Sequence, residues 1–393
     1  MLGIGILIPV VPQLLGEPHS AFYLLPQGHE SLGLLLLGVL MTVYPLALFF
    51  ASPVLGALSD KYGRKPILVG SIFGTAVSYL VFAYAIFTKN IPLLFFSRFV
   101  DGATGGNVSV AQAAVADLSS HEDRTKTFGM MGAVFGLGFI LGPFLGGVLS
   151  SSSVNSHFNA STPFVFSGFL SLLNTVFIAS FFKESIKSKM HDTKIYLLAS
   201  LKNIAKAHQF EQVRDLFLVS FLFTIGFSFY TSFFNVYLTN KFNFSAVEVG
   251  NFFAYIGLWV IITQLFVVRN IPPKYTEMIV LGPAYICSSI AMLLYLIPHY
   301  PWQLLFIVPL ASIPHGIQHA NFISLLTKRT DEKIRGEVLG VNASINSLAQ
   351  ALPPIFAGGL AVMFSDHAPI FMAAFFIFTA GLVFILQVKE KAV

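Results

Sequence analysis

Charged residues are scarce in this sequence. Asp, Glu, Lys and Arg make up only 10% of the 393 residues, whereas hydrophobic residues make up 55%. A soluble globular protein carries about 25% charged residues, because its surface must be solvated by water. This composition therefore excludes a cytosolic enzyme, a nucleic-acid-binding protein and a disordered chain. In a chain this apolar, we expect the formal net charge of +5 to reflect its orientation in a membrane.

Cysteine and the common nucleotide, metal and nucleophile motifs are also missing. The single cysteine, Cys287, lies in an apolar run, where we expect a small buried side chain. One cysteine excludes an intrachain disulfide and a thiolate metal site. The sequence has no Gly-x4-Gly-Lys-Ser/Thr loop, no zinc motif and no nucleophile elbow. We therefore expect no enzymatic activity, no ATP hydrolysis, no metal site and no cofactor.

Long, continuously apolar runs dominate the chain, and each is long enough for a membrane-spanning helix of about 20 residues except the first. The twelve runs are 1–15, 32–58, 66–88, 91–118, 124–150, 162–182, 212–239, 246–268, 276–298, 301–327, 335–364 and 367–388. They predict an all-α polytopic membrane protein with twelve transmembrane helices. The first run is short and lacks the basic leader of a signal peptide, so we expect a first helix that is truncated at its start.

Basic residues cluster on one side of these runs. Of the 23 Lys and Arg, 20 fall in the loops after the second, fourth, sixth, eighth, tenth and twelfth runs or in the first three residues of the run that follows. Cytoplasmic loops of membrane proteins carry such an excess. We therefore expect both termini in the cytoplasm, with the chain in a bacterial inner membrane.

The longest polar stretch lies between the sixth and seventh runs, so six runs precede it and six follow it. We expect a six-helix bundle at 1–182, a cytoplasmic linker at 183–211 and a second bundle at 212–393. Within the linker, apolar residues recur at helical spacing with lysines between them, which predicts an amphipathic helix on the membrane surface. This helix is either a plain connection or a regulatory or partner-binding segment.

An internal repeat at an offset of 211 residues relates the two halves. Gly105 falls on Gly316, and four residues around the fifth run fall on residues around the eleventh. These matches place Arg124 on Arg335, Gly129 on Gly340, Pro143 on Pro354 and Gly147 on Gly358. Many secondary transporters are built from parallel six-helix halves, with the solute site between the halves.

The loop after the second run reads Gly-Ala-Leu-Ser-Asp-Lys-Tyr-Gly-Arg-Lys at 56–65. Gly56 and Gly63 allow helix ends to approach and turn. Asp60 can face a helix N-terminus, and Arg64 can pair with Asp117 at a neighbouring helix end. We expect a charge latch that holds one conformation and opens in another. The alternative, that the bases only set membrane orientation, leaves the glycines and Asp60 unexplained.

Glycines and a proline recur within the fifth run. They are Gly138, Gly142, Pro143, Gly146 and Gly147. Pro143 removes a backbone hydrogen bond and bends the helix, and glycines near one face let another helix pack closely. We expect this helix to act as a gate between the halves, and ordinary tight packing is the alternative.

Together these motifs resemble the major facilitator superfamily, whose signature the loop at 56–65 matches nearly completely. Three further segments resemble its twelve-helix drug:proton antiporter branch, which includes the tetracycline efflux proteins. They are Leu2-Gly3-x-Gly5-x3-Pro9-Val10-x-Pro12, Leu94-x3-Arg98-x3-Gly102-x2-Gly105 and Gly138-x3-Gly142-Pro143-x2-Gly146-Gly147. The resemblance implies the major-facilitator fold of two six-helix bundles. In the antiporter branch, the last of these segments is associated with antiport.

Arg98 and Asp101 are charged residues inside the fourth run. At positions i and i+3 they share one helix face, and charges in the bilayer are usually paired and functional. The family implicates the Arg of this helix in proton movement. We expect Arg98 to bias a nearby carboxyl and Asp101, where the family often has Gln, to carry a proton. The alternative is a static Arg98–Asp101 pair that holds the helix in place.

Two further departures from the family pattern limit what the resemblance implies. Tetracycline antiporters have an Asp a few residues before the Gly-x-Gly of the first helix, a position that falls just before Met1. Relatives also have Gln four residues after a Tyr of the second helix, where this chain has Leu48 after Tyr44. The substrate contacts of that helix are therefore not expected here.

Polar residues in the later runs are candidates for a substrate cavity, because a polar stripe in an apolar helix most simply faces water. They are Tyr230, Asn235, Gln264, His315, Gln318, His319, Asn342, Asn346 and Gln350. His315 and His319 lie one helical turn apart. Their alternative roles are cavity lining, proton transfer, static contacts and, least favoured, metal binding.

Taken with this resemblance, the sequence predicts a monomeric secondary transporter that exports small amphipathic compounds, drugs such as tetracycline among them, in exchange for protons by alternating access. Its expected partners are the small-molecule substrate, protons and the lipid bilayer, and no nucleic acid. One alternative is a facilitator or proton symporter that imports a polar metabolite. A lesser alternative is a non-transporting sensor or scaffold derived from the superfamily.

Overall fold

The computed structural model describes residues 2–118, 124–186, 195–196, 198–272, 275–331 and 334–388, and within 124–135 only some side chains. All regular structure in these residues is helical. The main helices are α1 (Leu2–Leu15), α2 (Glu30–Tyr62), α3 (Arg64–Phe87), α4 (Ile91–Thr104), α5 (Asn107–Leu118), α6 (Arg124–Ser150), α7 (Thr162–Phe181), α8 (Ala199–Lys206), α9 (Arg214–Phe242), α10 (Ala246–Ile262), α11 (Glu277–Leu294), α12 (Leu304–Lys328), α13 (Arg335–Ala351), α14 (Pro353–Met363) and α15 (Ala368–Gln387). A π-helical segment, η2 (Thr263–Val267), continues α10.

The helices follow the predicted apolar runs. Within the described residues, 8 helices or joined helices are long and apolar enough to cross a membrane. The other predicted spans are α1, the α4–α5 pair, α6 and α12. The fourth span is broken at Gly105 and Gly106, and the eleventh is broken before Pro353, which lacks the N–H that a continuous helix requires.

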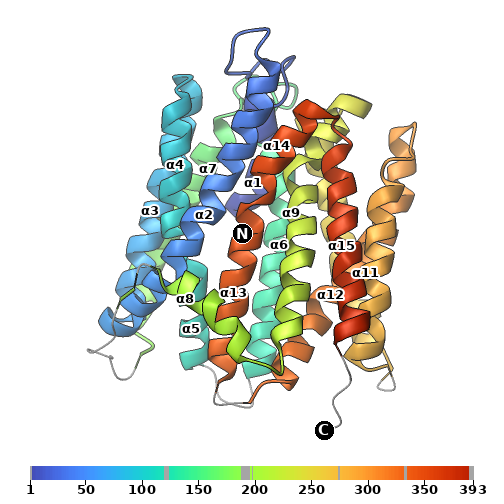
Figure 1. Ribbon diagram of the computed structural model, residues 1–393. Coiled ribbons are helices and arrows are strands. Elements are labelled where there is room, and N and C mark those ends of the chain that lie inside the picture. Colours follow the sequence, from blue (N-terminus) through green and yellow to red (C-terminus); the bar gives the residue numbers. More distant parts are fainter. Residues whose placement is uncertain are drawn as a thin grey trace.

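The long helices run side by side along a common direction (Figure 1). At one end of the bundle, here the α1–α2 end, α1 ends and α2 begins. At the opposite end, here the α2–α3 end, α2 ends and α3 begins, and α15 also ends there. α1 begins half-way between the two ends.

Apolar side chains both fill the interior and cover the outside. Phe164, Phe234 and Tyr237 are fully buried, whereas Phe181 and Leu386 are exposed on outer helices. A continuous apolar surface of this kind promotes association in water. Lipid tails solvate the same side chains as well as a protein core does, so this surface fits a helical bundle in a bilayer.

The structure corrects the expected burial of Cys287. The side chain of this residue on α11 is exposed. An apolar run in a membrane helix does not predict burial in protein, because lipid accepts an apolar side chain on the outer face equally well.

The described part of the linker contains the short helix α8, which contacts two membrane helices. Ser200 donates a hydrogen bond to a backbone carbonyl of α2. Lys206 forms an ion pair of 2.5 Å with Glu337 of α13. The linker residues 187–194 and 197 lie outside the described residues. α8 therefore connects α2, in the first half of the sequence, to α13, in the second half.

Candidate functional site

Arg64 lies at the centre of a hydrogen-bonded cluster at the α2–α3 end. Its guanidinium is 2.5 Å from Asp60 Oδ1 and 3.1 Å from Asp117 Oδ2, so it joins α2 to α5. The guanidinium also donates to Ser59 Oγ at 2.6 Å. The structure thus brings the latch candidates Asp60, Arg64 and Asp117 into one cluster.

A carboxylate that was not predicted from the sequence completes this cluster. Glu184, just after α7, accepts hydrogen bonds from the backbone N–H groups of Arg64 at 2.9 Å and Lys65 at 3.2 Å. Partial burial acts to raise the pKa of Glu184, but these and further backbone hydrogen bonds outweigh it and lower the pKa below 4.5. Glu184 therefore occupies the N-terminus of α3, where Asp60 was expected to be.

The two glycines of the latch have different surroundings. Gly63 has a φ of +112°, and a Cβ there would lie 2.4 Å from Glu184 Oε2. This backbone conformation favours glycine. At Gly56 nothing lies within 4 Å of the position of a Cβ. Close approach therefore requires glycine at Gly63 and not at Gly56.

Arg98 and Asp101 form a buried ion pair on α4. Arg98 Nη1 lies 2.5 Å from Asp101 Oδ2, and the side chains are 7% and 4% exposed. The guanidinium carbon is 4.6 Å from the ring centre of Tyr44 on α2, which is a cation–π contact. Gly102 permits this approach, because a Cβ there would lie 2.4 Å from the Tyr44 carbonyl oxygen. The pair on α4 thus packs closely against α2.

The glycines of α6 bring three helices together. Gly142 and Gly146 face α1, where backbone atoms would lie 2.7 Å and 2.6 Å from an added Cβ. Gly147 faces α10, where a carbonyl oxygen would lie 2.5 Å from an added Cβ. Gly138 and Pro143 are buried. α6 therefore packs between α1 of the first half and α10 of the second.

The internal repeat recurs in the contacts between the halves. Four glycines approach carbonyl oxygens of the other half so closely that an added Cβ would lie between 2.4 and 2.6 Å from the oxygen. The contacts are Gly250 with Pro143, Gly38 with Pro354, Gly147 with Ala246 and Gly358 with Leu34. Equivalent positions are 211 or 212 residues apart. The α6–α10 and α14–α2 contacts are thus equivalent, and both lie toward the α1–α2 end.

A second ion pair mirrors the Arg64–Asp117 pair with reversed charges. Lys328, at the end of α12, lies 2.5 Å from Glu277 Oε1 at the start of α11. Asp117 and Lys328 are 211 residues apart, which is the offset of the repeat. Each pair therefore connects the third helix of its half to the fourth helix of that half.

The two histidines of α12 differ in environment. The ring of His315 stacks on Phe227 of α9, with ring centres 4.4 Å apart, whereas His319 is exposed. Gln318, between them, donates to the carbonyl oxygen of Ala284 on α11 at 2.7 Å. No group of three or more His, Cys, Asp or Glu in the described residues is arranged to hold a metal ion.

Three further cavity candidates lie in helix–helix contacts. Tyr230 is buried beside Tyr295, with ring centres 5.9 Å apart. Asn235 is buried and donates to a backbone carbonyl of α1, so it joins the two halves. Gln264, in η2, donates to the Gly316 carbonyl oxygen of α12 at 3.0 Å. Each of these side chains therefore takes part in a contact between helices.

The polar stripe of α13 lies partly against α9. Asn346 Oδ1 accepts hydrogen bonds from Ser220 Oγ at 2.8 Å and from Thr224 Oγ1 at 3.1 Å. Asn342 is buried, and its Oδ1 has no hydrogen-bond partner among the described residues. Gln350 is exposed. The stripe thus serves a helix contact at Asn346 and leaves an acceptor available at Asn342.

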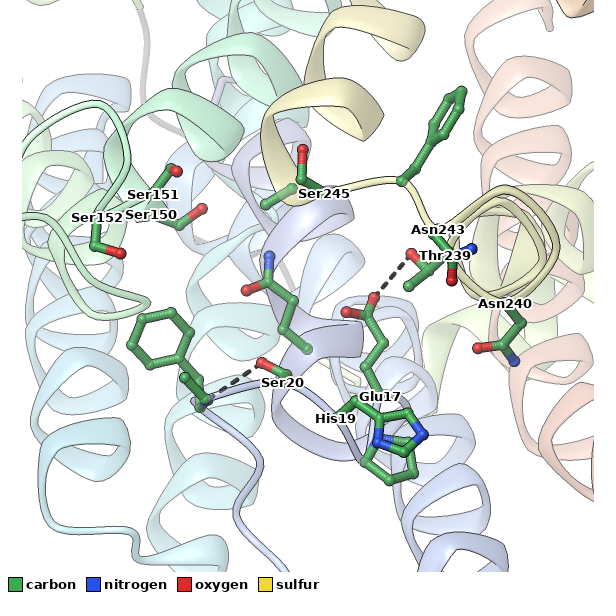
Figure 2. Close-up of a pocket in the computed structure, with 16 residues that line it drawn as sticks. Glu17, His19, Ser20, Ser150, Ser151, Ser152, Thr239, Asn240, Asn243 and Ser245 are labelled. Carbon is green, nitrogen blue, oxygen red and sulfur yellow. Dashed lines mark hydrogen bonds between the residues drawn. The ribbon is translucent and has the colours of Figure 1, made fainter. Parts of the chain in front are cut away.

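A cavity of about 600 Å³ lies at the α1–α2 end. It is lined by the ends of α1, α6 and α9, the start of α10 and the loop after α1. Figure 2 shows Glu17 reaching toward Thr239 of α9, whose hydroxyl donates to the carboxylate at 3.1 Å. None of the predicted cavity residues lines this space. The sequence signal for it is an acid two residues beyond the first apolar run.

Comparisons with known proteins show which family this chain belongs to. The family model described as Major Facilitator Superfamily matches residues 1–354. The tetracycline resistance protein of class C from Escherichia coli is 27% identical over 355 residues, which cover 90% of this chain and 85% of that protein. The quinolone resistance protein NorA from Staphylococcus aureus is 26% identical over 397 residues, which cover 99% of this chain and 93% of that protein.

A solved structure shares the fold. The human organic anion transporter MFSD10 (TETRAN) aligns with a TM-score of 0.73 and 23% sequence identity, over 98% of this chain and 95% of that one. The family match extends over most of the chain, and the helix arrangement agrees with that of a solved member. This chain therefore belongs to the major facilitator superfamily and is a membrane transporter with the fold of that family.

Proposed function

We propose that this transporter exports small amphipathic compounds in exchange for protons. The observation that carries the proposal is the Arg98–Asp101 pair, which is buried inside a membrane helix. Ionisable residues in such positions are costly and usually serve transport. Relatives named for tetracycline and quinolone resistance support amphipathic drugs as the substrate class.

Asp101 is the proposed proton carrier, and Arg98 is its permanent counter-charge. When Asp101 takes up a proton, the ion pair is lost and Arg98 retains its cation–π contact with Tyr44. Tyr44 lies on α2, which also contacts α13 and α14 of the second half. A change in protonation on α4 can therefore shift α2 and, through it, the contact between the halves.

The proposed moving bodies are residues 1–182 and 212–393, joined by the linker 183–211. We place the α2–α3 end in the cytoplasm, because its loops carry most of the Lys and Arg. The repeated glycine contacts hold the halves together at the α1–α2 end. Opening that end requires separation of α6 from α10 and of α14 from α2, with the Arg64 cluster and α8 acting at the other end.

Drug accumulation in a bacterial strain that lacks its main exporters tests this function. Expression of the chain is expected to lower the accumulation of tetracycline or a fluoroquinolone, and a protonophore is expected to remove the difference. Unchanged drug accumulation with increased uptake of a polar metabolite would instead support an importer. No change in either would support the sensor or scaffold.

The substitution Gly358→Ala is expected to lower the transport rate about tenfold, or ~1.4 kcal/mol in activation free energy. An added Cβ would lie 2.6 Å from the carbonyl oxygen of Leu34, so α14 and α2 would have to separate. Gly359→Ala is the matched control, because nothing lies within 4 Å of the position of its Cβ. Equal drug efflux by the two variants would contradict a role for this contact.

A further inference from the structure

The cavity at the α1–α2 end has the size and lining of a ligand site. Its volume of about 600 Å³ falls within the range of about 300–1,000 Å³ that ligand pockets occupy. Nine of its 16 lining residues carry hydroxyl or amide groups, and Phe22 and Phe244 contribute aromatic rings. Figure 2 shows residues 150–152 on one side of the space and Thr239 on the other.

Glu17 is the one charged side chain among the residues that line this cavity, and no Lys or Arg lines it. His19, in the same loop, is the other titratable lining residue. Charged residues on the neighbouring elements do not line the cavity. Glu248 and Asp366 accept hydrogen bonds from the lining residues Ser245 and Asn240, and Lys241 donates to the carbonyl oxygen of Leu296. The carboxylate of Glu17 therefore has a hydrogen bond from Thr239 and no Lys or Arg partner in the cavity.

We propose that this cavity is an additional substrate site that binds amphipathic organic cations, with Glu17 as their counter-ion. The inference rests on the proposed efflux function and places a site at the mouth through which substrate leaves. The cationic group would lie at Glu17, the apolar body near Phe22 or Phe244, and polar substituents at the hydroxyl groups of residues 150–152. Because Glu17 and Thr239 belong to different halves, an occupant would contact both.

Protons compete with the cation for Glu17. Burial raises the pKa of Glu17 from 4.5 to about 7, against the smaller lowering effect of the hydrogen bond from Thr239. Below this pH the carboxyl is neutral and loses its attraction for a cation, and above it the carboxylate is charged. An acidic medium at the α1–α2 end therefore favours release of the cation from this site.

Equilibrium binding of ethidium to the full chain in nanodiscs, with no pH gradient, tests the site. The Kd of the parent is expected to rise about tenfold or more between pH 8 and pH 5.5. Glu17→Gln is expected to bind ethidium weakly at both pH values. Glu30→Gln, in an acid that follows the same loop but does not line the cavity, is expected to behave as the parent.

A second variant keeps the test independent of the charge change. Ser151→Trp fills part of the cavity from a loop and leaves Glu17 in place, and it is expected to weaken ethidium binding at pH 8. Parental affinity and pH dependence in both Glu17→Gln and Ser151→Trp would overturn the site. This binding needs no transport, so a parent that binds through Glu17 but exchanges no protons would refute the efflux proposal and leave the site intact.

Discussion

The single substitutions Asp101→Asn and Arg98→Gln are expected to abolish transport and to reduce the amount of folded protein in the membrane. Each leaves one charge of the pair without its partner, at side chains that are 4% and 7% exposed. Removal of one partner from a buried pair costs about 3–5 kcal/mol. Substrate flux per transporter and the thermal midpoint in detergent measure the two effects separately.

The double variant Arg98→Gln/Asp101→Asn separates a proton carrier from a static pair. It leaves no unpaired charge, so we expect the amount of folded protein to recover. Transport driven by a pH gradient is expected to stay absent, because α4 then carries no carboxyl group. Recovery of both folding and transport would show that the pair is static. Arg214→Gln/Asp215→Asn is the control, because that exposed pair at 3.7 Å contributes about 1 kcal/mol or less.

The substitution Gly63→Ala has the second-largest expected effect, a loss of most transport with the helices still formed. The positive φ of +112° disfavours a side chain, and the added Cβ would lie 2.4 Å from Glu184 Oε2. Backbone strain of this kind costs about 1–3 kcal/mol. Relief of the strain would displace Glu184 from the start of α3 and disturb the cluster around Arg64. Transport assays and hydrogen exchange of the α2–α3 turn measure the outcome.

Gly70→Ala provides the matched control for Gly63→Ala. Gly70 lies on α3 with nothing within 4 Å of the position of its Cβ, and alanine is the better helix former by about 0.5–1 kcal/mol. This variant is expected to transport as the parent does. Transport by Gly63→Ala at the parental rate would contradict the requirement for the cluster.

Much of the fold follows from the sequence because a bilayer imposes the length of each apolar run. The ends of α7 and α15 lie within a residue or so of the predicted spans. The repeat was readable in the sequence because close helix contacts need glycine at fixed positions, as at Gly147 and Gly358. Burial was less predictable: Cys287 is exposed, since lipid and protein are equivalent surroundings for an apolar side chain.

The candidate site was predictable where residues of one helix or one short loop are involved. The Arg98–Asp101 contact follows from spacing on a single helix. Glu184 was missed, because a residue about 120 positions from the turn gives no local signal of the N–H groups that it binds. The contacts of the polar stripe on α13 also could not be predicted from local sequence. Periodicity identifies a polar face, but only tertiary packing places Asn346 against α9.

Simultaneous measurement of substrate and proton flux in proteoliposomes tests most directly whether this transporter exchanges protons for substrate. An imposed pH gradient is expected to drive tetracycline or a related amphipathic compound against the direction of proton flow. Addition of substrate is expected to move protons the opposite way, and Asp101→Asn is expected to do neither. A parent that moves no substrate under a pH gradient, or that moves substrate and protons in the same direction, would contradict the exchange.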